Sequence, residues 1–170
     1  MTPVFATSLD DTIGPVNHEA NKRSRLTLAQ YVRRRNGVPL GSSGSLRNML
    51  DRSLGAGTLA GFWRYWNPIW GYYLGRYVYG PIRTRLPPAL ALVATFVVSG
   101  ALHDAVASIL TGRWVFIITP WFFILGTGVI IGNVTKLNYS GLAWFARVLI
   151  NLGYIGGGLA LTQAILRTLT

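Results

Sequence analysis

Two ionisable side chains, His103 and Asp104, lie side by side inside a long apolar stretch of the sequence. No other ionisable residue occurs between Arg85 and Arg113. An ionisable group inside a membrane span costs about 2.5–3.5 kcal/mol on insertion scales and usually marks a functional position. Because a neutral imidazole can take a proton from an alcohol, His103 is a candidate general base. The alternative is a structural histidine that hydrogen-bonds a neighbouring helix.

The residues around His103 indicate one helix face that meets a partner. Ser99 lies four residues earlier, so the two side chains share a face, and Gly100 permits close approach of another helix or an acyl chain. A metal site is not expected, since adjacent helix positions point about 100° apart and the other histidine, His18, lies in the N-terminal tail. A Ser–His–Asp hydrolase triad is not expected either, because Asp104 cannot orient the ring of its own neighbour.

Asn67 is the second polar residue of note, in the aromatic block 62–68 and directly before Pro68. Pro68 can begin a helix, because its fixed φ and missing N–H suit the first turn. Asn67 is therefore either the cap of that helix or a residue that faces a substrate. The two roles are compatible.

The composition is that of a membrane protein. The chain has 170 residues, of which 51% are hydrophobic and only 12% are charged, about half the charged share of a soluble domain. Each span needs about 20 residues, so one unit with a handful of spans is expected. The chain has no cysteine, which excludes disulfides, thiolate metal sites and catalytic thiols.

The charge balance indicates an orientation in the membrane. Sixteen Lys and Arg against five Asp and Glu give a net charge of +11. The basic residues bunch at 22–35 and 47–85, ahead of the apolar segments, which is typical of a cytoplasmic surface held against anionic headgroups rather than of a nucleic-acid site. A cytoplasmic N-terminus is therefore expected. The excess of Arg over Lys favours a GC-rich bacterial genome, and hence a bacterial inner membrane.

The hydrophobic pattern predicts an all-α integral membrane protein with about three transmembrane helices. Apolar segments predict spans at 89–110, 114–134 and 142–166. The aromatic segment 59–79 is expected to form an interfacial or re-entrant helix, and 26–35 and 46–54 are expected to form short amphipathic helices. The chain is then expected to comprise a disordered polar tail (1–25), a basic membrane-surface region (26–58) and a membrane-embedded core (59–170).

Two segments resemble the signature motifs of the membrane-bound O-acyltransferase (MBOAT) superfamily. The first is similar to the family's F-W-x-x-W-(N/H) segment and its trailing Y-x-Y-x-P, and consists of Phe62, Trp63, Arg64, Trp66 and Asn67 followed by Tyr77, Tyr79 and Pro81. The second is similar to F-x-x-S-(A/G)-x-x-H-(D/E), and consists of Phe96, Ser99, Gly100, His103 and Asp104. The motifs occur in the family's order and at a family-like separation. The resemblance covers roughly 46–170 and is specific over 62–104.

The resemblance implies acyl transfer from a thioester donor, either acyl-CoA or an acyl-carrier protein, to a hydroxyl acceptor. It implies that His103 is the catalytic general base and that Asn67 is its catalytic partner near the donor. Ser99, Asp104 and Trp66 are expected to support them. No metal or other cofactor is expected.

The resemblance also indicates where the substrates meet the chain. In the family the donor enters a membrane-embedded tunnel from the cytosol, and the acceptor enters from the opposite side or from the lipid. Basic residues near the cytosolic mouth, here Arg64, Arg76 and Arg83, are expected to contact donor phosphates or lipid headgroups. Topology alone is the alternative explanation for any one of these arginines.

The sequence departs from the family in the number of spans. Full members have many more spans, and their N-terminal half builds much of the tunnel wall. A homo-oligomer or a larger membrane complex is therefore expected. The alternative function is a non-catalytic membrane subunit or lipid-binding scaffold built on a reduced core, in which the glycines of 153–158 allow close helix packing.

Overall fold

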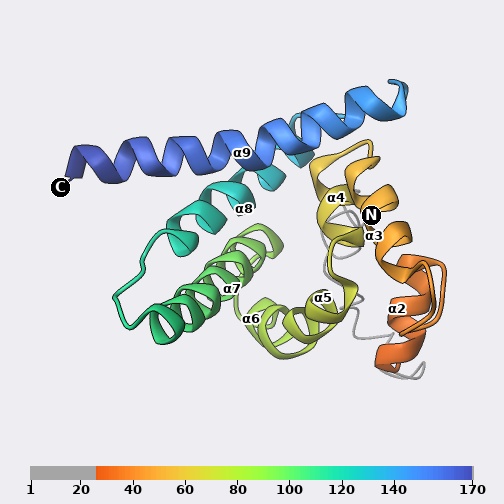
Figure 1. Ribbon diagram of the computed structural model, residues 1–170, viewed down its shortest axis with the longest axis horizontal. Helices are drawn as coiled ribbons and strands as arrows, with labels where there is room; N and C mark the ends of the chain where they lie inside the picture. The colour runs from red at the N-terminus through yellow and green to blue at the C-terminus, as the bar shows by residue number, and fades with distance from the viewer. Residues whose placement is uncertain (1–25, 170) are drawn as a thin grey trace.

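The computed structural model describes residues 26–169, and these residues form helices joined by short turns, without a strand among them (Figure 1). Two of the helices are long and apolar enough to cross a membrane, and a third apolar helix is shorter. The predicted all-α membrane fold is thereby confirmed. The tail predicted over 1–25 lies outside the described residues.

Two short helices begin the described chain, α2 (Leu28–Asn36) and α3 (Ser45–Leu54). Thr27 and Gln30 start α2 with a reciprocal capping box, and Gly37 ends it in the left-handed conformation at φ 84°, as glycine commonly does at helix ends. Asn36 joins the pair, because its amide nitrogen donates to the carbonyl and hydroxyl oxygens of Ser45 at 2.9 and 2.7 Å.

The aromatic segment forms α4 (Leu59–Tyr65), α5 (Pro68–Leu74), a π turn η2 (Gly75–Tyr79) and α6 (Gly80–Arg83). The sequence predicts this aromatic helix only as far as residue 79, but the helical run that starts at Pro68 continues to Arg83. Pro81 has no N–H to donate, and the N–H of Gly80 reaches back to the carbonyl of Gly75. This wider π turn allows the helix to continue through Pro81.

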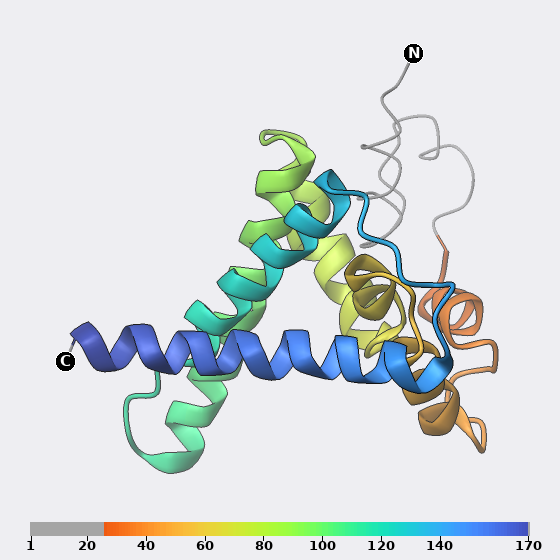
Figure 2. The same ribbon diagram turned by 90° about the horizontal axis from the view of Figure 1, so that it is seen from above.

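Three apolar helices follow, α7 (Pro88–Thr111), α8 (Ile118–Val134) and α9 (Trp144–Leu169). α7 and α8 pack along each other as a hairpin, and α9 crosses the hairpin with its C-terminal end projecting beyond it (Figures 1 and 2). The second predicted span was placed from Trp114, but α8 begins at Ile118. The reason is the side chain of Asp104, described below.

The core lies where α4, α7 and α8 meet. Its largest buried side chains include Phe62, Tyr79, Leu92 and Leu125. A second buried contact is polar: the amide nitrogen of Asn151 in α9 donates to the carbonyls of Leu54 and Ala56 at 2.8 and 3.0 Å, and its oxygen accepts from the Tyr139 hydroxyl at 2.7 Å. Asn151 thereby ties α9 to the turn between α3 and α4.

Candidate active site

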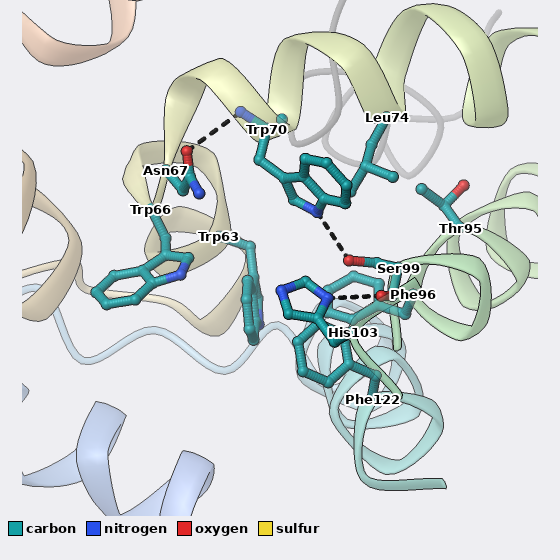
Figure 3. A pocket seen from close by; sticks show the side chains of 11 residues that line it. Trp63, Trp66, Asn67, Trp70, Leu74, Thr95, Phe96, Ser99, His103 and Phe122 are labelled. Atoms are coloured by element: carbon teal, nitrogen blue, oxygen red, sulfur yellow. Dashed lines mark hydrogen bonds between the residues drawn. The ribbon is translucent and has the colours of Figure 1, made fainter. Parts of the chain in front are cut away.

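A pocket of about 100 Å³ lies between α5, α7 and the first turns of α8. Its walls are mainly aromatic (Figure 3). It brings together four residues expected at the site, Trp66, Asn67, Ser99 and His103. The other lining residues are Trp63, Trp70, Gly71, Leu74, Thr95, Phe96 and Phe122. The two motifs, distant in sequence, thus meet around one cavity.

The ring of His103 is oriented by its own helix. Its Nδ1 atom lies 2.7 Å from the carbonyl oxygen of Ser99, one turn earlier in α7. A carbonyl oxygen only accepts, so Nδ1 carries a proton, and in the neutral imidazole Nε2 then has the lone pair. Figure 3 shows this second nitrogen turned toward Trp63 and Asn67. A neutral imidazole with Nε2 facing a cavity has the protonation state and the direction that a general base needs.

Asn67 caps α5 and faces the same pocket. Its backbone is left-handed, at φ 39°, a conformation that asparagine adopts more readily than most residues. Its side-chain oxygen accepts from the backbone N–H of Trp70 at 3.2 Å, as an N-cap residue does. The amide nitrogen, which carries two N–H groups, is then left for the pocket side (Figure 3). The cap role and the substrate-facing role predicted as alternatives are therefore compatible in this geometry.

Two aromatic side chains bracket the His103 ring. Trp70 meets it edge to face, with centroids 5.7 Å apart and planes at 84°, and Phe122 lies at 5.4 Å with planes at 35°. The indole N–H of Trp70 also donates to the hydroxyl of Ser99 at 2.9 Å. Neither Trp70 nor Phe122 was identified from the sequence. Trp70 follows Asn67 by one helical turn, which is a weak signal, and Phe122 lies on another helix, where nothing in the sequence pattern indicates the contact.

Asp104 supports the site from outside the pocket. Its carboxylate is buried and accepts from the backbone N–H groups of Ile117, Ile118 and Thr119 at 3.2, 2.9 and 2.8 Å, and from the Thr119 hydroxyl at 2.6 Å. An anion at a helix N-terminus satisfies orphan N–H groups and complements the helix dipole. Asp104 therefore fixes the start of α8, and with it the position of Phe122.

Gly100 explains how closely α8 approaches α7. A Cβ added to Gly100 would lie 2.7 Å from the Cα of Thr119 and 3.1 Å from the Cβ of Phe122. Real Cβ atoms do not approach backbone atoms so closely. Three residues of the S-G-x-x-H-D segment thus position the site: the carbonyl of Ser99 binds the His103 ring, Gly100 lets α8 approach closely, and Asp104 caps α8.

The three arginines expected at the donor mouth do not line the pocket. Arg76 donates to the Tyr72 hydroxyl at 2.7 Å and lies 5.8 Å from the centroid of the Tyr77 ring. Arg83 donates to the carbonyl of Leu86 at 3.3 Å. Their contact with donor phosphates, and that of Arg64, stays a prediction. Within residues 26–169, no group of three or more His, Asp or Glu side chains is placed to hold a metal ion.

Comparison with known proteins agrees with these motifs. Residues 47–156 match the family model of MBOAT, the membrane-bound O-acyltransferase family. The match spans more than half of the chain, so the protein belongs to the MBOAT family. At the level of the family, it is a membrane protein of the acyltransferase class. Neither a curated protein nor a solved structure matches the chain.

Proposed function

We propose that this protein transfers an acyl group from a thioester donor, acyl-CoA or an acyl-carrier protein, to a hydroxyl acceptor in the membrane. One observation carries the proposal. The 2.7 Å contact between Nδ1 of His103 and the Ser99 carbonyl leaves Nε2 as an acceptor in a pocket shared with Asn67. A base and an N–H donor on two sides of one cavity are the two groups that acyl transfer requires.

The reaction follows from these two groups. Nε2 of His103 takes the hydroxyl proton as the acceptor oxygen attacks the thioester carbonyl carbon and forms the new C–O bond. The carbonyl oxygen becomes an oxyanion, which the amide N–H groups of Asn67 stabilise. The intermediate collapses, the C–S bond breaks, and the imidazolium returns its proton to the departing thiolate. Atoms and charge balance without a metal or a redox partner.

The base works without a carboxylate behind it. Asp104 is occupied by the N-terminus of α8, so the Ser99 carbonyl takes the orienting position that an acidic side chain holds in many hydrolases. Trp63, Trp70 and Phe122 supply aromatic walls beside the reacting atoms, and covering the open side of the pocket would exclude water and strengthen the interactions there.

The pocket size indicates which part of the substrates the chain holds. A cavity of about 150 Å³ in another protein binds benzene, so about 100 Å³ accommodates the thioester carbonyl, the attacking oxygen and a few carbons. The rest of the donor and acceptor then lies outside, against lipid or another chain. His103 and Asn67 are exposed, which supports a second copy or a partner subunit as the remaining wall.

The proposal includes the membrane in which the protein lies and the arginines that contact the acyl donor. Arg64, Arg76 and Arg83 are carried by the α4–α6 segment that also supplies Trp66 and Asn67. We propose that they attract the donor's phosphates at the cytoplasmic face of a bacterial inner membrane, with the N-terminus on that face. Membrane lipids surround the apolar helices.

A second candidate function is a non-catalytic membrane subunit or lipid-binding scaffold. The observation that favours it is the glycine-rich part of α9. Among the described residues, and apart from adjacent residues and the nearby backbone of α9 itself, no heavy atom lies within 4 Å of a Cβ built on Gly153, Gly156 or Gly157. This face is open to a helix of another chain. If the chain serves this role, packing at these glycines matters and His103 does not.

One experiment separates the two functions. The purified chain is incubated with acyl-CoA species of several lengths and a membrane extract, and labelled acyl esters are measured. We expect His103→Ala to abolish transfer, and the matched His18→Ala variant to retain it. Circular dichroism and gel filtration check that both variants fold. Full transfer by a folded His103→Ala variant, or none by the wild type with any donor, contradicts the proposal.

A further inference from the structure

We propose that Trp70 is a positioning residue that holds the imidazole of His103 in the orientation of a base. This inference rests on the proposed function, but it concerns a residue outside both sequence motifs. Trp70 touches all three polar groups of the site. Its backbone N–H bonds to Asn67, its indole N–H bonds to the Ser99 hydroxyl, and its ring meets His103 edge to face.

The His103 ring needs this support. The contact between Nδ1 and the Ser99 carbonyl is a single hydrogen bond, and the ring torsion of a histidine has broad, roughly two-fold freedom. A ring that turns over would direct Nε2 away from the cavity. Trp70 on one side and Phe122 on the other limit that rotation. The orientation of Nε2 is therefore set by the two walls as well as by the hydrogen bond.

The wall formed by Trp70 is itself fixed by Ser99. The 2.9 Å bond from Nε1 to the Ser99 hydroxyl restricts the side-chain torsions that set the plane of the Trp70 indole. Ser99 thus acts twice: its carbonyl binds the imidazole, and its hydroxyl binds the residue that confines the imidazole. Removing either end of the Trp70–Ser99 bond should release the same constraint.

Trp70 also couples the two catalytic candidates. The cap bond from its backbone N–H fixes the side-chain oxygen of Asn67, and the indole of the same residue reaches His103. Trp70 therefore helps to set the distance between the Asn67 amide group and the His103 ring, because it contacts both side chains. Phenylalanine at position 70 keeps the backbone bond and the ring but loses the indole N–H, which makes it the informative substitution.

A double-mutant cycle tests the inference by kinetics. Trp70→Phe, Ser99→Ala and the double variant are compared in the acyl-transfer assay, with Trp114→Phe as the control, since Trp114 is 89% exposed and does not line the pocket. We expect each single variant to lower kcat about tenfold, which is the scale of one lost hydrogen bond. KM should be unchanged, and the double variant should lose no more than either single one. Additive losses, or wild-type kcat in a folded Trp70→Phe variant, overturn the inference.

A spectroscopic measurement tests it without turnover. The chain has two histidines, so a His18→Asn background labelled with ¹⁵N-histidine reports His103 alone. We expect one tautomer, protonated at Nδ1, and its loss to an averaged signal in both Trp70→Phe and Ser99→Ala. Identical spectra in all variants refute the positioning role.

The two experiments distinguish a failure of the proposed acyl-transfer function from a failure of the positioning role of Trp70. If His103→Ala retains transfer, the proposed function fails whatever Trp70 does. If His103→Ala is inactive while Trp70→Phe keeps both the wild-type kcat and the single tautomer, the function stands and the role of Trp70 is rejected.

Discussion

Nδ1 of His103 and the carbonyl oxygen of Ser99 lie 2.7 Å apart on successive turns of α7. Because both residues belong to one helix, this hydrogen bond forms within α7 alone. The walls of the pocket do depend on tertiary packing, since Trp70 comes from α5 and Phe122 from α8. The hydrogen bond that holds the base is thus local to α7, whereas the aromatic walls around its ring depend on the packing of α5 and α8.

Asn67 offers a way to separate capping from catalysis. Asn67→Asp keeps an oxygen for the Trp70 N–H, whereas Asn67→Ala removes it. We expect Asn67→Ala to lose about 1 kcal/mol of stability, the usual cost of an N-cap, and Asn67→Asp to lose less. Both should lower kcat about 100-fold, because neither offers amide N–H groups to the oxyanion. Thermal unfolding in detergent and the transfer assay measure the two effects. An active Asn67→Asp enzyme would show that Asn67 is a cap alone.

Asp104 is expected to act on stability. Asn at this position cannot serve all of the N–H groups at the start of α8, and the charge that complements the helix dipole is lost. We expect Asp104→Asn to destabilise the chain by about 1.5–3 kcal/mol, as for buried hydrogen bonds to a charged group. The exposed Asp51 provides the control, and Asp51→Asn should leave the melting midpoint unchanged. Equal midpoints for both variants would argue against the capping role.

Two glycine substitutions compare a closed helix contact with an open one. At Gly100 a new methyl group meets the Cα of Thr119 at 2.7 Å, whereas at Gly153 it meets no described atom within 4 Å. Gly100→Ala should cost about 1–3 kcal/mol by overpacking and should displace Phe122 from the His103 ring. Gly153→Ala should leave unfolding unaffected. Comparable stability of the two variants would mean that α7 and α8 do not pack as described.

Tyr139, in the loop between α8 and α9, predicts a dependence on alkaline pH. Burial raises the pKa of the Tyr139 hydroxyl to about 12, above its ordinary value of 10.0. The unfolded chain therefore loses this proton first, so the stabilisation is fully present below about pH 10 and is lost as pH rises through about 12. We expect the melting midpoint of the wild type to fall more steeply over this range than that of Tyr139→Phe. Tyr73→Phe, at an exposed tyrosine, should follow the wild type.

The sequence was informative where a feature is local. The apolar segments predicted three helices, and the Ser99–His103 spacing predicted their shared face, because both depend on helical periodicity alone. The start of α8 was wrongly predicted at Trp114, because the carboxylate of Asp104, in another helix, sets it at Ile118. The contact between Phe122 and His103 was missed because it too joins two helices. The helix across Pro81 was missed because a π turn leaves no hydrophobic signal.

We expect the reacting groups to meet between His103 and Asn67. An electron cryomicroscopy structure of the protein in lipid nanodiscs, with a non-hydrolysable thioether analogue of an acyl-CoA, tests it most directly. With a 2-oxoalkyl thioether, in which one methylene separates the carbonyl from sulfur, we expect the carbonyl carbon in the pocket, its oxygen within hydrogen-bonding distance of the Asn67 amide nitrogen, and Nε2 of His103 facing it. Analogue density elsewhere on the chain, with the pocket filled by lipid or by a helix of another subunit, would contradict it.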